Sequence, residues 1–203
     1  MNVSVDALRK LESGEYKRLA GVLARAFETD AMAAHIFRDP ARRLSDVERM
    51  FGLFLRRIYL PQQECYTVAG LKGGALWLPP GEYPLPARQQ LRLLPGFIRL
   101  FGLFRTPAVF RDIDHMEKMH PKEEPHWYLA FLGVEPSEQG KGLGSALLRP
   151  VLNRCDAEGV PAWLETTNER NLSLYERHGF RVVDECDIPR GPHFWGMWRE
   201  PLG

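Results

Sequence analysis

The sequence predicts a single α/β domain, and three observations lead to this fold class. The 203 residues are about the length of one domain and are enough to bury a hydrophobic core. Apolar residues make up 44% of the chain and charged residues 26%, as in globular proteins and unlike disordered ones. Segments with apolar residues at helical spacing alternate with short apolar segments typical of strands. We therefore expect one domain over residues 1–203.

The N-terminal part of the chain, up to about residue 125, predicts a strand, two helices and a hairpin in that order. Residues 5–11 alternate as in a short strand, and residues 16–27 carry apolar side chains at helical spacing. Ser45 and Glu48 form a capping-box pattern. The apolar stripe that follows them stops before Pro61, which predicts the second helix.

Two further segments complete this half. Residues 65–69 and 75–78 flank a glycine-containing turn and predict a β-hairpin. Residues 91–110 are apolar but are interrupted by arginines and prolines, so we interpret them as a broken amphipathic helix that covers an apolar groove. Contact of this segment with a membrane surface is the alternative. Thr106 and Pro107 are typical of the start of a further helix.

The C-terminal part, residues 126–199, has a more regular pattern. The expected elements are a strand at 126–134, a helix at 143–157, a strand at 162–166, a helix at 169–178 and strands at 180–186 and 193–199. Pro150 removes one amide from the helix at 143–157 and should kink it. Gly179, just past the next helix, suits a left-handed cap.

Charge and cysteine content exclude several classes of protein. Lys plus Arg (27) and Asp plus Glu (26) leave a net charge of +1, which gives no sign of a nucleic-acid partner. Cys65, Cys155 and Cys186 are odd in number and widely spaced, so they predict neither a disulfide framework nor a zinc site, but reduced thiols in a cytoplasmic protein. The histidines have no metal-ligand spacing, and no window reaches the about 20 apolar residues of a membrane span. We expect no metal and no membrane partner.

A glycine-rich loop between a strand and a helix predicts an anion site. Residues 134–145 read Val-Glu-Pro-Ser-Glu-Gln-Gly-Lys-Gly-Leu-Gly-Ser. The glycines allow successive backbone N–H groups to point to one place at the helix N-terminus, where a pyrophosphate binds well. The loop is not a P-loop, because no Lys-Ser or Lys-Thr pair follows its second glycine, and it lacks the third glycine of a dinucleotide fingerprint, since Leu147 stands there.

Two motifs in this half occur in a specific order. Residues 139–144, Gln-x-x-Gly-x-Gly after an apolar strand, resemble the acyl-coenzyme-A signature of the GNAT-type N-acetyltransferase superfamily. Residues 168–180, Asn-x5-Leu-Tyr-x3-Gly-Phe, resemble its second pattern. More narrowly, residues 126–199 resemble the puromycin N-acetyltransferase branch. The shared segments are His126-Trp127, Gly-Lys-Gly-Leu-Gly-Ser-Ala at 140–146, Leu164-Glu165-Thr166, Arg170-Asn171-Leu172 and Tyr175-Glu176-Arg177.

The resemblance implies the GNAT acyltransferase fold, a mixed central sheet with splayed strands flanked by helices, and acetyl-CoA as co-substrate. Residues 1–125 would hold the acceptor-binding elements and residues 126–199 the acetyl-CoA-binding half. The pantetheine arm would pair with the exposed backbone of one splayed strand, as an added strand does. The implied cofactor-binding residues are Leu132, Gly133 and Val134 for this arm, Gln139, Gly140, Lys141, Gly142, Leu143, Gly144 and Ser145 for the pyrophosphate, and Asn168 and Tyr175 from the second motif.

Tyr175 is the first candidate for a catalytic residue. Acetyl transfer leaves a coenzyme A thiolate, and a phenol with a pKa near 10 can protonate a thiolate whose pKa is near 8.5. The helical pattern alone favours a packing role for this tyrosine, and the second motif reverses that preference. Asn168 would cap the helix, and the resemblance adds a hydrogen bond to the pantetheine arm.

The general base has two candidates. An amine is mostly protonated at neutral pH, so a carboxylate, an imidazole or a water chain must take its proton. Glu165 lies in an apolar strand, where an unpaired carboxylate is costly to bury, and a structural hydrogen-bonded role is the alternative. His126, at the start of the splayed strand, is the other candidate.

These observations predict an N-acetyltransferase that transfers acetyl from acetyl-CoA to a primary amine acceptor, in a ternary complex and without a covalent enzyme intermediate. A small molecule is the expected acceptor. The alternative is a non-catalytic acyl-CoA-binding module or sensor, in which the loop remains and the chemistry does not. A Rossmann-like nucleotide-binding enzyme is disfavoured by Leu147.

Overall fold

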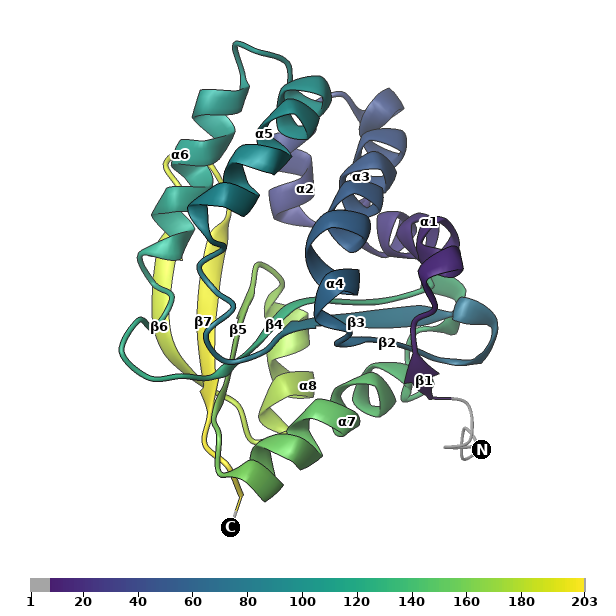
Figure 1. Ribbon diagram of the computed structural model, residues 1–203, viewed down its shortest axis with the longest axis vertical. Coiled ribbons are helices and arrows are strands. Elements are labelled where there is room, and N and C mark those ends of the chain that lie inside the picture. Colours follow the sequence, from purple (N-terminus) through teal and green to yellow (C-terminus); the bar gives the residue numbers. More distant parts are fainter. Residues whose placement is uncertain (1–7, 203) are drawn as a thin grey trace.

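A seven-stranded mixed sheet runs through the molecule, and helices cover both of its faces (Figure 1). The structure is a computed structural model that describes residues 8–202. The strands lie in the order β1-β2-β3-β4-β5-β7-β6, and every neighbouring pair is antiparallel except β4 and β5. Their bounds are β1 Arg9–Lys10, β2 Cys65–Thr67, β3 Gly73–Leu78, β4 Trp127–Val134, β5 Ala162–Thr166, β6 Arg181–Asp187 and β7 His193–Arg199. The predicted mixed sheet is confirmed.

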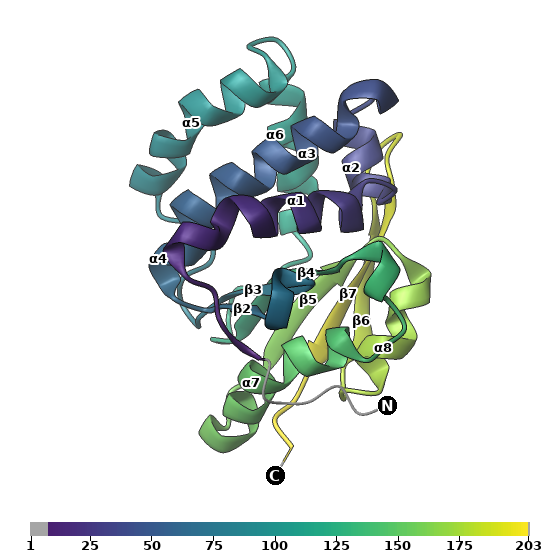
Figure 2. The same ribbon diagram turned by 90° about the vertical axis from the view of Figure 1, so that its right-hand side faces the viewer.

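Within residues 8–202, helices α1–α6 lie on one face of the sheet and helices α7 and α8 on the other (Figure 2). The first group is α1 Tyr16–Phe27, α2 Ala31–Ile36, α3 Pro40–Phe54, α4 Leu60–Gln62, α5 Ala87–Phe101 and α6 Thr106–Glu117, and the second is α7 Leu143–Glu158 and α8 Leu172–Glu176. Because side chains alternate along a strand, Leu76 and Leu78 of β3 pack under the first group and Trp77 under the second. The sheet therefore separates two hydrophobic cores.

The second predicted helix starts earlier than the sequence predicts. The capping box expected at Ser45 and Glu48 is wrong, because α3 begins earlier, where the Asp39 carboxylate accepts a hydrogen bond from the Ala41 N–H at 3.0 Å and Pro40 fills the first helical position. Ser45 lies inside the helix, and its hydroxyl donates to the Arg42 carbonyl at 2.9 Å.

The end of that helix also differs from the expectation. Helical backbone continues past α3 through a π-helical segment, Leu55–Tyr59, into α4, which contains Pro61. Pro61 has no N–H for the carbonyl of Arg57, four residues before it. That carbonyl accepts a hydrogen bond from Gln89 Nε2 at 3.1 Å instead. A side chain from α5 thus replaces the missing backbone donor.

The other elements lie close to their predicted bounds. β1 occupies only Arg9–Lys10 of the strand expected at 5–11, and residues 5–7 of it lie outside the described part of the chain. The helix expected at 169–178 is a 3-10 turn, Glu169–Asn171, followed by α8, and Gly179 has the expected left-handed φ of +87°. α7 runs through Pro150 to Glu158.

The segment predicted as a broken amphipathic helix is the pair α5 and α6. Among residues 8–202 no single helix is long and apolar enough to cross a membrane, and this pair meets that criterion only together, bent by 118°. Its buried side chains, which include Leu93, Phe97, Phe101 and Val109, belong to the core on the α1–α6 face of the sheet.

β4 and β5 separate after a short parallel contact. Their pairing covers only Trp127 to Leu129 on β4 and Ala162 to Leu164 on β5. Beyond these residues β4 stays paired with β3 as far as Val134, while β5 stays paired with β7 as far as Thr166. The sheet therefore opens between the two strands, as the splayed-strand prediction requires, and the β5-facing edge of residues 130–134 is left without a strand partner.

Helix α1 packs very closely on the far end of β4. A Cβ atom placed on Gly133 would lie 2.7 Å from Leu23 Cδ2 and 3.2 Å from Ala26 Cβ, both in α1. The Arg25 guanidinium binds the Glu135 carboxylate through two atoms, with Nε–Oε1 and Nη2–Oε2 distances of 2.8 and 2.7 Å. The absence of a side chain at Gly133 thus sets how near α1 comes to the opening.

We expect Gly133→Ala to lower the free energy of unfolding by about 1–3 kcal/mol, because the new methyl group overlaps α1. Gly52→Ala is the matched control, since Gly52 lies inside α3 with no atom within 4 Å of the added Cβ, and the exchange should stabilise that helix. Urea unfolding of both variants measures the difference. Equal stability of the two would show that α1 is not held against β4 in this way.

Candidate active site

The glycine-rich loop forms a cradle of free backbone N–H groups at the start of α7. Gly140 and Gly142 have φ values of +75° and +83°, a backbone region that favours glycine, and Gly142 is the N-cap of the helix. Among the hydrogen bonds within residues 8–202, none is donated by a backbone N–H of residues 140–145. These N–H groups and the positive end of the helix dipole make the loop a binding site for an anion.

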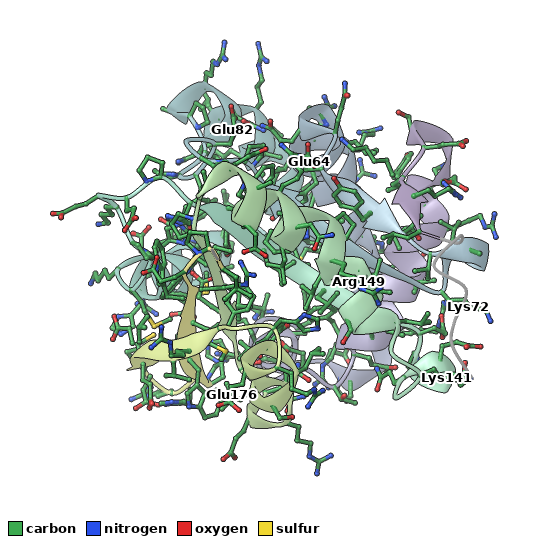
Figure 3. The ribbon with its side chains drawn as sticks, turned by 90° about the horizontal axis from the view of Figure 1, so that it is seen from below. Glu64, Lys72, Glu82, Lys141, Arg149 and Glu176 are labelled. Carbon is green, nitrogen blue, oxygen red and sulfur yellow. The ribbon has the colours of Figure 1, made fainter. Side chains whose placement is uncertain are left out.

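The polar side chains of the loop hold it in shape. Gln139 Nε2 donates to the carbonyl of Val134, the last residue of β4, at 3.1 Å. Lys141 Nζ donates to the Ser137 carbonyl at 3.0 Å and to Glu138 Oε2 at 3.1 Å, while Lys72 contacts the other Glu138 oxygen at 3.2 Å. Figure 3 shows Lys72 and Lys141 at the same edge of the molecule. Lys141 therefore folds back on its own loop.

The second motif brings α8 against this loop. Asn168 Oδ1 accepts a hydrogen bond from the Arg170 N–H at 3.1 Å, so the expected capping role is present. Leu174 Cδ2 lies 3.4 Å from the place of a Cβ on Gly144, which brings α8 against the first turn of α7. Tyr175 is buried with its ring 6.1 Å from that of Phe180. Burial raises the pKa of Tyr175 above 10, so the phenol keeps its proton at physiological pH.

The two predicted base candidates lie on the other face of the sheet and are joined by a residue that the sequence did not single out. Glu165 Oε1 accepts a hydrogen bond from Trp163 Nε1 at 2.6 Å and lies 3.2 Å from His120 Nδ1. His120 Nε2 lies 3.0 Å from His126 Nε2, and His126 Nδ1 donates to the Glu124 carbonyl at 2.6 Å. His120 comes from the segment after α6, 45 positions before Glu165, so no spacing in the sequence indicates it.

Aromatic side chains surround this cluster. The Tyr83 ring is centred 4.2 Å from that of His120 and 5.0 Å from that of Tyr128. Burial, and after it other effects that include the charge of Glu165, raises the pKa of both tyrosines, so their phenols are neutral. Burial also lowers the pKa of His126, which favours its uncharged form near pH 7.

Glu165 and Tyr175 lie on opposite faces of the sheet, beside its opening. Glu165 is the first residue of β5 beyond the last pair with β4. Trp163, two residues before it and therefore on the same face of the strand, packs in the core under α1–α6. Tyr175 packs in the core under α7 and α8. The hydroxyl of Thr167 donates to Asp30 at 2.6 Å and so ties the end of β5 to the turn between α1 and α2. Glu165 and Tyr175 thus belong to the two different cores that the sheet separates.

A surface cleft of about 620 Å³ lies between α1 and the loop. Its lining includes Lys17, Arg18, Lys72 and Glu138, and neither Glu165 nor Tyr175. It is open and carries charges of both signs, so we place the chemistry at the opening of the sheet rather than here. Within the described residues no group of three or more His, Cys, Asp and Glu side chains is placed to hold a metal ion.

Comparison with known proteins gives a consistent family. Residues 96–180 match the acetyltransferase (GNAT) family. An uncharacterized N-acetyltransferase of Schizosaccharomyces pombe is 25% identical over 198 residues, which cover 86% of this chain and 74% of that protein. The crystal structure described as histone acetyltransferase HPA2 and related acetyltransferase, from Corynebacterium glutamicum, has a TM-score of 0.74 at 22% identity, over 97% of both chains. At that identity the likeness shows the fold.

A second relative matches over a shorter length. Mycothiol acetyltransferase of Paenarthrobacter aurescens is 33% identical over 84 residues, which are 38% of this chain and 26% of that protein. The chain thus spans about a quarter of this relative. The narrower likeness to the puromycin N-acetyltransferase branch stays a prediction.

We expect Gly142→Asp to abolish binding of coenzyme A to the loop, because a carboxylate then stands where the N–H groups meet an anion. Gly159→Asp is the matched control, since Gly159 caps the other end of α7 with a φ of +67° and equally open surroundings. Binding is measured by the rise of the melting temperature with coenzyme A. Gly144→Asp should act like Gly142→Asp, and unchanged affinity in either folded variant would show that the loop is not the site.

Proposed function

We propose that this chain, whose residues 96–180 match the acetyltransferase (GNAT) family, is an acyl-CoA-dependent acetyltransferase that acetylates the primary amine of a small molecule by direct attack in a ternary complex. The observation that carries the proposal is that the loop with free backbone N–H groups follows directly after β4, whose edge toward β5 has no strand partner beyond Leu129. A pyrophosphate needs the first and an amide-containing arm needs the second.

Acetyl-CoA fits the two halves of this arrangement. The N–H groups from Gln139 to Ser145 would hold its pyrophosphate, with Lys141 close by. The unpaired edge of β4, at Leu132, Gly133 and Val134, offers amide and carbonyl groups for hydrogen bonds to the pantetheine arm. Asn168 would add a hydrogen bond at the start of α8. The thioester then comes to the opening between β4 and β5.

The residues on the two faces divide the proton transfers between them. Glu165 would take the proton that the amine loses as its nitrogen attacks the thioester carbonyl, and His126 is connected to it through His120. Tyr175 would give its proton to the sulfur as the carbon–sulfur bond breaks. Burial raises the pKa of Tyr175, so its phenol is protonated before the thiolate forms.

We expect Tyr175→Phe to lower kcat by roughly 10² to 10⁴-fold while acetyl-CoA affinity and the melting temperature stay nearly unchanged, because only the proton donor is removed. Tyr66→Phe is the matched control, as Tyr66 lies in the same core but donates its hydroxyl to Glu64 at 2.8 Å. Steady-state kinetics and thermal unfolding of both variants give the comparison. A loss of affinity or stability with little change in kcat would assign Tyr175 to binding or packing.

The acceptor side of the site is apolar. α5 and α6 cover the sheet face that carries Glu165, with Phe97 and Phe101 buried in its core, and Tyr83 and Tyr128 stand beside His120. These surroundings support an aromatic or bulky apolar amine as the acceptor, and residues 91–110 as the cover of its pocket.

We expect kcat/KM for an arylalkyl amine such as 2-phenylethylamine to exceed that for spermidine by about tenfold or more, since a polycation needs an acidic pocket to offset its desolvation. Release of free thiol from acetyl-CoA measures both reactions under the same conditions. A preference for spermidine would contradict the apolar acceptor site.

A further inference from the structure

A continuous line of hydrogen-bonding groups leads from the opening of the sheet to the segment just before β4. It runs from Glu165 through His120 and His126 to the Glu124 carbonyl, with heavy-atom distances of 3.2, 3.0 and 2.6 Å. The side chains of Glu165 and His120 are only 5% and 4% exposed, so water does not stand in for a missing partner. At the other end, Glu124 lies in an exposed segment. We call the side chains of Glu165, His120 and His126 the Glu-His-His chain.

The directions of the hydrogen bonds fix how many protons the chain holds. A carbonyl oxygen only accepts, so the bond to Glu124 is donated by His126 Nδ1. A neutral His126 then has a bare Nε2, and the bond between the two rings is donated by His120 Nε2. A neutral His120 that carries its proton on Nε2 has a bare Nδ1. The contact with Glu165 is therefore a hydrogen bond only if one additional proton lies between the two groups.

Loss of this additional proton creates a base. The Nδ1 lone pair of His120 and a carboxylate oxygen of Glu165 then face each other at 3.2 Å with nothing between them, in a site that excludes water. Two acceptors in that arrangement repel each other. Uptake of one proton removes the repulsion and completes the line of hydrogen bonds.

We infer that Glu165, His120 and His126 act as one base, in which His120 is a positioning residue that holds the proton of the amine against Glu165. This inference rests on the proposed function and adds a residue to it. As the nitrogen lone pair forms the bond to the acetyl carbon, the N–H bond breaks and its proton passes to Glu165, where it is shared with His120 Nδ1. His126 accepts the hydrogen bond from His120 Nε2 and so holds that ring with its bare Nδ1 toward Glu165.

Of the five other titratable groups around the Glu-His-His chain, four are neutral and the fifth is the carboxylate of Glu117. Those that face it are Tyr59 from the π-helical segment, Tyr83 from the loop before α5, Glu117 from α6, Tyr128 from β4 and Cys186 from β6. Burial raises the pKa of the three tyrosines and of the thiol, so all four are neutral. The Glu117 carboxylate accepts the Tyr83 hydroxyl at 2.7 Å.

The first experiment follows the protons of the protein without substrate. NMR spectra of the protein, labelled with nitrogen-15 in histidine and with carbon-13 in the glutamate carboxyl, are recorded across pH. We expect His120 Nδ1 and the Glu165 carboxyl to change together with one shared midpoint, while His126 keeps its proton on Nδ1. Glu165→Gln should remove that titration step from His120. His35→Gln is the control, because it alters the contact of 2.9 Å between His35 and Asp112, which are not part of the Glu-His-His chain, and it should leave the step unchanged. Independent titration of the two groups overturns the inference.

The second experiment measures kcat against pH at saturating acetyl-CoA and amine. For the unaltered protein we expect a limb that rises with pH as the additional proton leaves, and Glu165→Gln should flatten it. His120→Asn can donate to Glu165 but cannot take the proton. It should lower kcat by about tenfold or more and displace the limb, with KM values within about threefold. Imidazole added to His120→Ala should restore activity about tenfold.

The outcomes separate the inference from the function beneath it. An unchanged limb and kcat in His120→Asn, or no rescue of a folded His120→Ala by imidazole, overturns the role of His120 alone. If His120→Asn does not fold, the shared titration and its loss in Glu165→Gln still decide the matter. Failure of the unaltered protein to acetylate any amine, with no stabilisation by acetyl-CoA, overturns the proposed function instead.

Discussion

The early separation of β4 and β5 is the constraint on which the rest of the molecule depends. Only three residue pairs join the two strands before each follows its antiparallel neighbour. Strand edges inside a sheet are costly unless their N–H and C=O groups find other partners. An opening of this kind is therefore a place for a ligand that can pair as a strand does, and it gives access to the sheet from both faces.

The two faces supply different chemistry to that opening. On the α7–α8 face the loop presents unused N–H groups, and Tyr175 keeps its proton because it is buried. On the α1–α6 face a carboxylate and two imidazoles form one hydrogen-bonded line among aromatic rings. The sheet itself therefore separates Tyr175 from Glu165.

Contacts at the rim keep the opening in shape. Arg25 of α1 binds Glu135 just past β4, Thr167 just past β5 binds Asp30, and Gln139 binds the last carbonyl of β4. Each joins one edge of the gap to a helix or to the loop. Gly133 has no side chain and lets α1 lie directly on β4, which brings Arg25 close to Glu135.

The sequence by itself determined the elements whose causes are local. The apolar periods gave α1, β5 and β7 at their observed bounds, and the glycines at 140 and 142 gave the loop, because a positive φ needs no distant partner. The order of two motifs indicated the acetyltransferase (GNAT) family, which residues 96–180 match. The start of α3 is local as well, since Asp39 and Pro40 set it rather than Ser45. Tertiary structure decided how helical backbone continues past Pro61, since Gln89 comes from another helix.

The tertiary structure also decided how the two base candidates are related. Glu165 and His126 each follow from the residues beside them, but the residue that joins them, His120, lies in a segment with no periodic pattern. Its position depends on Tyr83 and Tyr128, whose rings pack around its own. Contacts between residues far apart in the sequence leave no spacing to read, so only the folded chain shows that three groups form one line.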